Sequence, residues 1–301
     1  MRTGTFSIVA HDPRSGELGV AVQSHWFSVG SVVSWARPGV GAVATQSVAE
    51  IAHGPNVLER LQEGLDPAAA IAAVLEHDEL ADYRQVGAVD ARGRVAAHTG
   101  EGCIAHAGQV IGQHFSCQAN MMADPSVPQA MAEAYRSAEG DLAERLLGAL
   151  DAAQAAGGDI RGRQSAAMRV APASGEPWRA RFDLRVEDHG EPLLELRRLL
   201  RLGRAYEMAA RADELSAEGA HAAATELYLR AAKLAPEADE LTFWAGVGVA
   251  AEDFERGVEL VRQAAGRKPA WLTLLDRVPS ELAPTAAAIA QRLGGGETAA
   301  G

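Results

Sequence analysis

Near its start the chain reads TFSIVA at residues 5–10, a β-rich stretch in which the residue character alternates. Such alternation is typical of a β-strand. A turn signal, DPRSG, follows at residues 12–16, and LGVAVQS at residues 18–24 then predicts a second strand antiparallel to the first. Thr5 therefore begins a strand that is expected to pair with its nearest neighbour in the sequence.

Working outward from this pair, further strands alternate with pairs of helices. Strands are predicted at residues 29–36, 39–46, 85–89, 94–98, 110–118, 164–170 and 181–186. Helices are predicted at residues 55–64, 68–77, 126–138 and 141–156. Asp66 is expected to cap the second of these helices, because Pro67 follows it at a first helical position.

The order of these elements places the first 190 residues in the α+β class. Paired helices that follow paired antiparallel strands favour helix layers outside stacked sheets, which is a four-layer αββα sandwich. A simpler two-layer α+β domain agrees with the same pattern. Small residues are frequent in the strands, and they allow another layer or a ligand to approach closely.

From about residue 191 to residue 293 the pattern is helical and repeats itself. Ala231 and Ala264 lie 33 positions apart, as do Pro236 and Pro269, and the residues around them resemble a tetratricopeptide-type helix pair. The other matching positions are Gly219, Ala224, Tyr228, Phe254 and Gly257. Because about three repeats are needed to stand alone, these helices are expected to pack on the first domain or on another subunit.

The chain is therefore expected to contain a domain at residues 1–190, helical repeats at residues 191–293 and a disordered tail at residues 294–301. The uncovered ends of so short a repeat array favour a homo-oligomer. The repeats also offer a surface on which a protein partner could bind.

The composition limits the classes of partner. The chain has 301 residues, is 48% hydrophobic and carries a formal net charge of −12, so it lacks the basic character that nucleic acid binding requires. No apolar run is long enough to predict a membrane span, and the first residues lack a signal-peptide pattern, so a cytoplasmic location is expected. Cys103 and Cys117 are then expected to be free, buried thiols. The histidines have no metal-binding spacing, and neither a metal nor a cofactor is expected.

The strongest chemical candidate is Thr5. A threonine hydroxyl can act as a nucleophile when the α-amino group of the same residue is free to accept its proton. Gly4 precedes Thr5 and gives the backbone the freedom to bend for self-cleavage. The structural alternative is an ordinary β-branched strand residue.

Two further residues are catalytic candidates because they could stabilise charge at Thr5. Arg37 follows Thr5 by 32 positions, and a cation there would lower the pKa of the nucleophile and stabilise developing negative charge. Asn120 ends another predicted strand, where its amide could donate to an oxyanion. Their structural alternatives are a solvated arginine and a turn residue.

Six polar residues at strand ends or in a connecting loop are candidates for substrate binding: Ser24, His25, Gln46, Asp159, Gln164 and Ser165. The histidine stands beside two aromatic residues after a strand and could line a pocket or cap the core. The cluster at residues 159–165 lies where a strand begins, and it could bind a substrate or orient a terminal amine. The alternative for that cluster is a polar connecting loop.

Five blocks of sequence carry a resemblance to a known family: TFSIVA at residues 5–10, GVGAVATQ at 39–46, GRVAAHTG at 93–100, QANMM at 118–122 and GDIRGRQS at 158–165. Together, and in this order, they resemble the domain-of-unknown-function 1028 family. That family is assigned by fold to the N-terminal-nucleophile hydrolase superfamily. Several of its members carry a tetratricopeptide-like tail.

The resemblance implies an αββα sandwich and hydrolysis of an amide bond by an N-terminal threonine, with Thr5 at the matching position. Arg37 falls where proteasome-like relatives have a lysine, and an arginine keeps the charge but does not act as a base near pH 7. In many relatives the threonine directly follows the initiator methionine, whereas residues 1–4 precede it here. We therefore expect an amidohydrolase acting on a small-molecule or peptide amide; the alternative is an inactive binding or assembly protein whose repeats recruit a partner.

Overall fold

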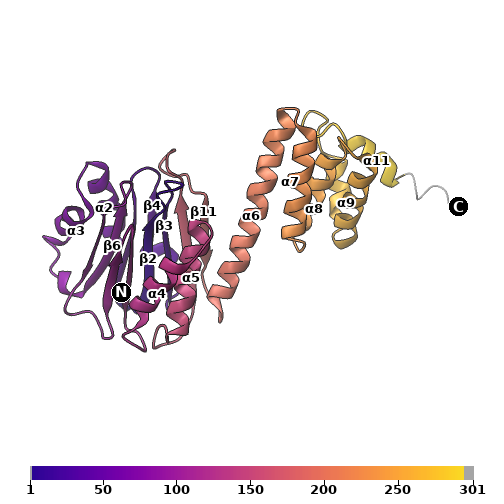
Figure 1. The fold of residues 1–301 in the computed structure, drawn as a ribbon. Coiled ribbons are helices and arrows are strands. Elements are labelled where there is room, and N and C mark those ends of the chain that lie inside the picture. The colour runs from indigo at the N-terminus through magenta and orange to yellow at the C-terminus, as the bar shows by residue number, and fades with distance from the viewer. Residues whose placement is uncertain (1, 295–301) are drawn as a thin grey trace. The chain divides into compact units, whose positions relative to one another are not determined.

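The structure is a computed structural model that describes residues 2–294. The chain divides into two compact units, residues 1–198 and residues 199–301. The mixed α and β class predicted from the sequence is confirmed, with the strands in the first unit and helices in both (Figure 1). Among the described residues, no helix is both long and apolar enough to cross a bilayer.

A six-stranded antiparallel sheet forms one of the two central layers of the first unit. Its strands lie in the order β11-β10-β3-β2-β9-β8. Their bounds are β2 Thr5–His11, β3 Leu18–Ser24, β8 Gly108–Gly112, β9 Phe115–Asn120, β10 Ser165–Ala171 and β11 Phe182–Val186. The strand that begins at Thr5 is therefore an interior strand, paired on both sides.

A second antiparallel sheet forms the other central layer, in the order β1-β5-β6-β7, with β4 also paired to β5. Its strands are β1 Arg2–Thr3, β4 Ser34–Arg37, β5 Gly41–Val48, β6 Arg84–Asp90 and β7 Val95–Thr99. Because β1 belongs to this sheet and β2 to the other, the chain crosses between the sheets at Gly4. A 3-10 turn, Ala81–Tyr83, leads into β6.

Two pairs of helices cover the outer faces of the sheets (Figure 1). Helices α2 (His53–Gln62) and α3 (Pro67–Leu75) pack on the sheet that contains β5, and α4 (Val127–Ser137) and α5 (Leu142–Ala155) pack on the other. Asp66 accepts a hydrogen bond from the Ala69 amide and caps α3, as its position before proline predicts. The layers thus lie in the order helix, sheet, sheet, helix.

The space between the sheets changes character along β2. Near its far end Val9 packs with Val20, Ala42 and Val89 in a buried apolar cluster. Near its beginning the inward-facing residues are polar, starting with Thr5 and Ser7, and they are fully buried as well. Since buried polar groups need hydrogen-bond partners, the polar end of the sandwich must hold a specific network.

Two sequence predictions of strands need correction. Residues 30–33 form a short helix, α1 (Gly30–Val33), although valines favour strands; a Cβ at Gly30 would lie 2.5 Å from that of Ala167, so tertiary packing decides the conformation there. The single strand predicted at residues 110–118 is a hairpin of β8 and β9. Its turn contains His114 at a φ of 66°, without the glycine or asparagine that usually signals such a turn.

The second unit is helical. Helix α6 (Pro192–Ala217) begins in the first unit, so the predicted boundary at residues 190–191 lies just before it. It is followed by α7 His221–Leu234, α8 Asp239–Val249, α9 Phe254–Arg267, α10 Ala270–Leu275 and α11 Ala286–Gly294. Tyr228 and Ala224 of α7 pack on Ala245 and Val249 of α8. The tetratricopeptide likeness stays a prediction, and residues 295–301 of the predicted tail lie outside the described residues.

Candidate functional site

Four polar residues form one row across neighbouring strands at the end of the sheet where β2 begins. Thr5 is directly opposite Ser24 of β3 on one side and Asn120 of β9 on the other, and Ser24 is opposite Ser165 of β10. Residues opposite one another in a sheet share a face. The register therefore brings together four residues that were predicted as site residues from separate parts of the sequence.

The peptide bond that precedes Thr5 is held by its carbonyl oxygen. Thr5 Oγ1 donates a hydrogen bond to Ser24 Oγ at 3.2 Å, and Ser24 Oγ in turn donates to the carbonyl oxygen of Gly4. A second donor, Arg161 Nη2, lies 2.8 Å from the same oxygen. The threonine hydroxyl, the serine hydroxyl and a cation thus converge on one amide group.

Asp159 fixes the position of Arg161. Its carboxylate accepts from Arg161 Nε at 3.0 Å and from Nη2 at 2.7 Å, which is a two-point contact that sets the plane of the guanidinium. It also accepts from the backbone amide of Arg161 at 2.9 Å and from that of His25 at 3.0 Å. The Asp159 side chain is fully buried, so it acts through the arginine and the loop rather than on a ligand.

The α-carbon of Gly4 has no room for a side chain. A Cβ built there would lie 2.8 Å from Arg161 Nη2, 3.0 Å from Asp159 Oδ2 and 3.0 Å from the Cβ of Met121. The arginine cannot move away without breaking its two-point contact with the carboxylate. The position before Thr5 therefore requires glycine, for steric reasons that the sequence alone did not reveal.

Below Thr5, side-chain amides fill the space between the sheets. Gln46 Nε2 donates to the Thr5 carbonyl oxygen at 3.2 Å and to Gln85 Oε1 at 2.7 Å, while Gln46 Oε1 accepts from Ser7 Oγ at 2.6 Å. Gln118 Nε2 donates to Ser7 Oγ at 2.8 Å. All of these residues are fully buried. This network connects both sheets to the backbone on the carboxyl side of Thr5.

Asn120 ends its strand as predicted, but its amide nitrogen, which was predicted to donate to an oxyanion, is used within the buried network. Its Nδ2 donates to Gln85 Oε1 at 3.1 Å, and its Oδ1 is buried without a partner. The unused atom is an acceptor, which repels an oxyanion and suits an amine. The row thus offers Thr5 an unpaired oxygen on the strand next to it.

The structure does not bring Arg37 to Thr5. Arg37 ends β4 opposite Gly41, five positions along β5 from Gln46, a separation of roughly 17 Å at about 3.4 Å per residue. Its Nη1 donates to Gln62 Oε1 at 2.6 Å in an exposed contact. The cation at Gly4 is instead Arg161, which lies two positions after the predicted Asp159.

The remaining predicted residues, in the row or beside it, make no hydrogen bond to Thr5. Ser165 Oγ accepts from the Val29 amide at 3.0 Å and donates to the Trp26 carbonyl, so it fixes the loop after β3. Gln164 contributes its carbonyl to the His189 amide at 2.7 Å. His25 is half-buried, and its Nδ1 has no partner.

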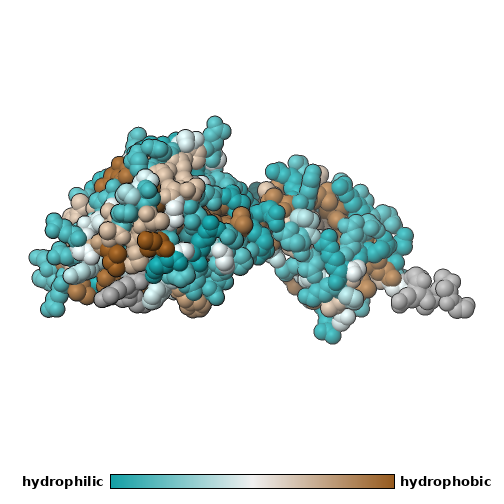
Figure 2. Space-filling model, turned by 90° about the horizontal axis from the view of Figure 1, so that it is seen from below, coloured by the Kyte–Doolittle hydropathy of each residue, from teal (hydrophilic) through white to brown (hydrophobic). Residues whose placement is uncertain are grey.

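Apolar residues flank the loops of the site. Phe27, two positions after His25, is 62% exposed, and Ile160, next to Asp159, is 65% exposed. Figure 2, which views the molecule from below, shows hydrophobic patches among polar surface on this unit.

The two thiols are free: Cys117 is fully buried and Cys103 is partly buried. Burial raises the pKa of each thiol, so neither suits a nucleophile.

A family model described as "Family of unknown function (DUF1028)" matches residues 5–196, beginning at Thr5 itself. The chain belongs to the DUF1028 family. A solved member, protein SPO2555 from Silicibacter pomeroyi, is 34% identical; the alignment covers 66% of this chain and 85% of that one, with a TM-score of 0.61. The DUF1028 domain thus accounts for nearly all of the first unit.

A further structure compared with this DUF1028 protein is Anbu (ancestral beta-subunit) from Yersinia bercovieri. It is 12% identical, with 68% of this chain and 96% of that one covered and a TM-score of 0.32, a value too low to establish a common fold. No curated protein matches the chain.

Replacing Gln46 by leucine tests the buried network. Ser7 Oγ and the Thr5 carbonyl would each lose a partner without gaining access to water, so we expect the free energy of unfolding to fall by about 3 kcal/mol. Chemical denaturation measures it. Gln62→Leu, at an exposed glutamine on α2, is the control and should change it by less than about 0.5 kcal/mol. Equal effects of the two substitutions would contradict the network.

Proposed function

We propose that this DUF1028 protein is an amidohydrolase of the N-terminal-nucleophile type, with Thr5 as its nucleophile. The observation that carries the proposal is that Ser24 and Arg161 both donate hydrogen bonds to the Gly4 carbonyl oxygen. This carbonyl belongs to the residue directly before Thr5, whose hydroxyl donates to Ser24. Hydrogen-bond donors aimed at a carbonyl oxygen stabilise the negative charge that develops there during attack. In the uncut chain the first amide in this position is the protein's own.

The first reaction in this proposal is self-cleavage between Gly4 and Thr5. The Thr5 hydroxyl oxygen attacks the Gly4 carbonyl carbon, the carbon–nitrogen bond breaks, and the nitrogen takes the proton that the hydroxyl loses. Ser24 Oγ, which accepts from Thr5 and donates to the Gly4 oxygen, is placed to carry that proton. Water then hydrolyses the resulting ester and releases residues 1–4 with a new carboxylate, which leaves Thr5 with a free amine and its hydroxyl.

The second reaction uses the same groups on a substrate. The freed amine of Thr5 takes the hydroxyl proton, the oxygen attacks the substrate amide carbonyl, and the amine half of the substrate leaves with that proton. Ser24 and Arg161 then hold the substrate oxygen where they held that of Gly4. The unpaired Oδ1 of Asn120 is a suitable acceptor for the new amine, and water releases the acyl group.

The crowding around Gly4 indicates which acyl groups fit. A substrate acyl group that takes the place of Gly4 has little room beside its carbonyl. A Cβ on its α-carbon would lie within 3.0 Å of atoms of Arg161, Asp159 and Met121. We therefore propose amides of glycyl-type acyl groups, which are unbranched beside the carbonyl. The exposed Phe27 and Ile160 would face apolar parts of such a substrate more favourably than charged ones.

The αββα layers and the resemblance to N-terminal-nucleophile hydrolases support the same class of reaction. An inactive assembly protein stays the alternative, but a site without activity would not need the Arg161 clamp, the half-buried guanidinium that donates to the Gly4 carbonyl oxygen. The homo-oligomer and the protein partner expected from the helical region stay predictions.

Arg161→Gln tests the role of the clamp. Loss of one charged oxyanion donor should slow the appearance of a chain beginning at Thr5 by about 100-fold, as followed by intact mass after synthesis. Arg163→Gln is the matched control, because Arg163 pairs with Glu191 in an exposed contact outside the site. Equal processing rates in both variants would exclude the clamp from the reaction.

Two chromogenic substrates test the acyl preference. A chain that begins at Thr5 should hydrolyse acetyl-glycine 4-nitroanilide with a kcat/KM at least about tenfold above that for acetyl-L-alanine 4-nitroanilide. Thr5→Ala should abolish hydrolysis of both. A preference for the alanine substrate would contradict the steric argument. Absence of hydrolysis by a chain that begins at Thr5 would contradict the proposed amidohydrolase activity.

A further inference from the structure

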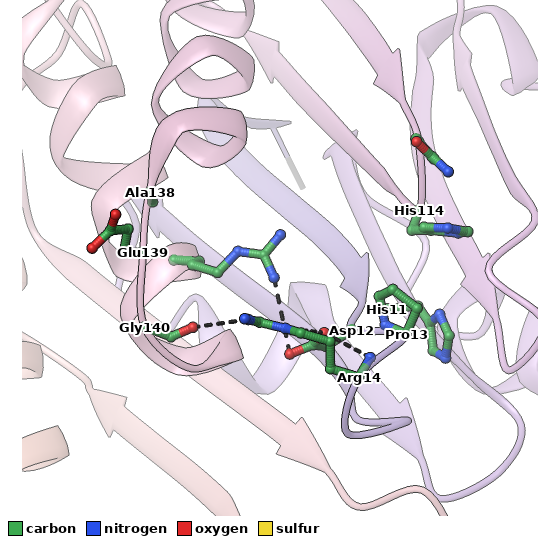
Figure 3. Close-up of a pocket in the computed structure, with 10 residues that line it drawn as sticks. His11, Asp12, Pro13, Arg14, His114, Ala138, Glu139 and Gly140 are labelled. Atoms are coloured by element: carbon green, nitrogen blue, oxygen red, sulfur yellow. Dashed lines mark hydrogen bonds and ion pairs between the residues drawn. The ribbon is translucent and has the colours of Figure 1, made fainter.

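A polar pocket lies at the other end of β2 from Thr5. It has a volume of about 690 Å³ and is lined by His11, Arg14 and Arg145, among others (Figure 3). His11 is the last residue of β2 and Thr5 the first, so the two ends are roughly 20 Å apart at about 3.4 Å per residue. The pocket is therefore separate from the site at Gly4 and has no part in the reaction proposed there.

Arg145 is the most informative residue of this pocket. Its side chain is only 17% exposed, and its guanidinium stacks on the ring of Tyr135 with 4.4 Å between carbon and centroid. Its nearest ionic partner is Asp12, whose Oδ2 lies 3.9 Å from Nη1, beyond hydrogen-bond distance, and its Nε is buried without a partner. Among the residues that the structure describes, none accepts a hydrogen bond from this guanidinium, although it offers five N–H donors.

Asp12 holds a second arginine on the same wall. The carboxylate accepts from the Arg14 backbone amide at 3.0 Å and from Arg14 Nε at 3.4 Å, and Arg14 Nη2 donates to the Gly140 carbonyl at 3.1 Å. One carboxylate thus faces two guanidiniums. Glu139 also lines the pocket, but its carboxylate points away from Arg14 (Figure 3).

Two imidazoles complete the wall. The rings of His11 and His114 meet edge to face, with 5.8 Å between centroids. His114 Nδ1 lies 3.0 Å from the Gly93 carbonyl, which fixes this nitrogen as a donor. Burial and the neighbouring His114 lower the pKa of His11, which favours its neutral form.

We propose that this pocket binds a small oxyanion, the phosphate group of a small-molecule ligand. Arginine guanidiniums bind phosphate through paired hydrogen bonds, and a phosphate offers several acceptors to donors that converge from different elements. Arg14 comes from the turn after β2 and Arg145 from α5, so a tetrahedral anion between them bridges a loop and a helix. Binding would give the exposed part of the Arg145 guanidinium a hydrogen-bond acceptor at shorter range than Asp12.

Calorimetric titration of the full chain with inorganic phosphate tests the proposal. We expect saturable binding that Arg145→Gln and Arg14→Gln each weaken by about tenfold or more. The second variant keeps the test decisive if the first unfolds, because the Arg14 side chain is 70% exposed. Arg60→Gln, in an exposed pair with Glu63 on α2, is the control and should bind as the unaltered chain does.

Thr5→Ala should bind phosphate unchanged, so this result is independent of the hydrolase proposal. Absence of saturable binding, or affinity that neither pocket substitution alters, would overturn the anion site. Acetate binding as tightly as phosphate, through the same two arginines, would overturn the assignment to phosphate.

Discussion

The alignment of β2 between β3 and β9 is the constraint on which the site depends. It places Ser24 and Asn120 on either side of Thr5, and it brings the carbonyl oxygen of Gly4 to Ser24 Oγ and Arg161 Nη2. A slip of one residue would turn Thr5 toward the outer helices and remove it from every one of these partners. The alternation of polar and apolar residues at the start of β2 opposes such a slip, since it would exchange the faces of the buried Ser7 and the buried Phe6 and Ile8.

The buried amides support this alignment from the opposite sheet. Gln46 reaches across the sandwich to the backbone of Thr5, and Gln85 links Gln46 to Asn120. A polar network of this kind is costly unless every partner is in place, so it favours one arrangement of the sheets strongly. The Asn120 oxygen is the exception, and an unpaired acceptor beside a threonine has a chemical use once an amine is present.

Much of this architecture could be predicted from local sequence. The strand of Thr5, its hairpin partner and the capped helix after Asp66 follow from alternation, turn residues and proline placement. Residues 30–33 could not, because packing of Gly30 on Ala167 overrides the strand preference of the valines. Arg37 ends a strand about where the sequence predicts one, but β4 pairs with β5 so that Arg37 lies opposite Gly41, far from Gln46 and Thr5. Local sequence does not show this pairing.

The contact of Arg161 with the Gly4 carbonyl oxygen could not be predicted from the sequence either. Asp159 could be selected as a polar residue at a strand start, but the importance of Arg161 arises from an interaction with Gly4, 157 positions earlier in the chain. Only the fold shows that this arginine and Ser24 share one carbonyl oxygen. A glycine before a threonine was a weak signal, and its steric meaning depends on Met121 from a third segment.

The proposed self-cleavage passes through an ester between the Gly4 acyl group and the Thr5 hydroxyl. Synthesis of the protein in the presence of hydroxylamine, which attacks esters far faster than amides, tests for that ester directly by mass spectrometry of the released peptide. We expect a peptide of residues 1–4 that ends in a hydroxamate at Gly4, and a chain that begins at Thr5. An uncut chain, or a released peptide that carries only a carboxylate at Gly4, would contradict the proposed self-cleavage.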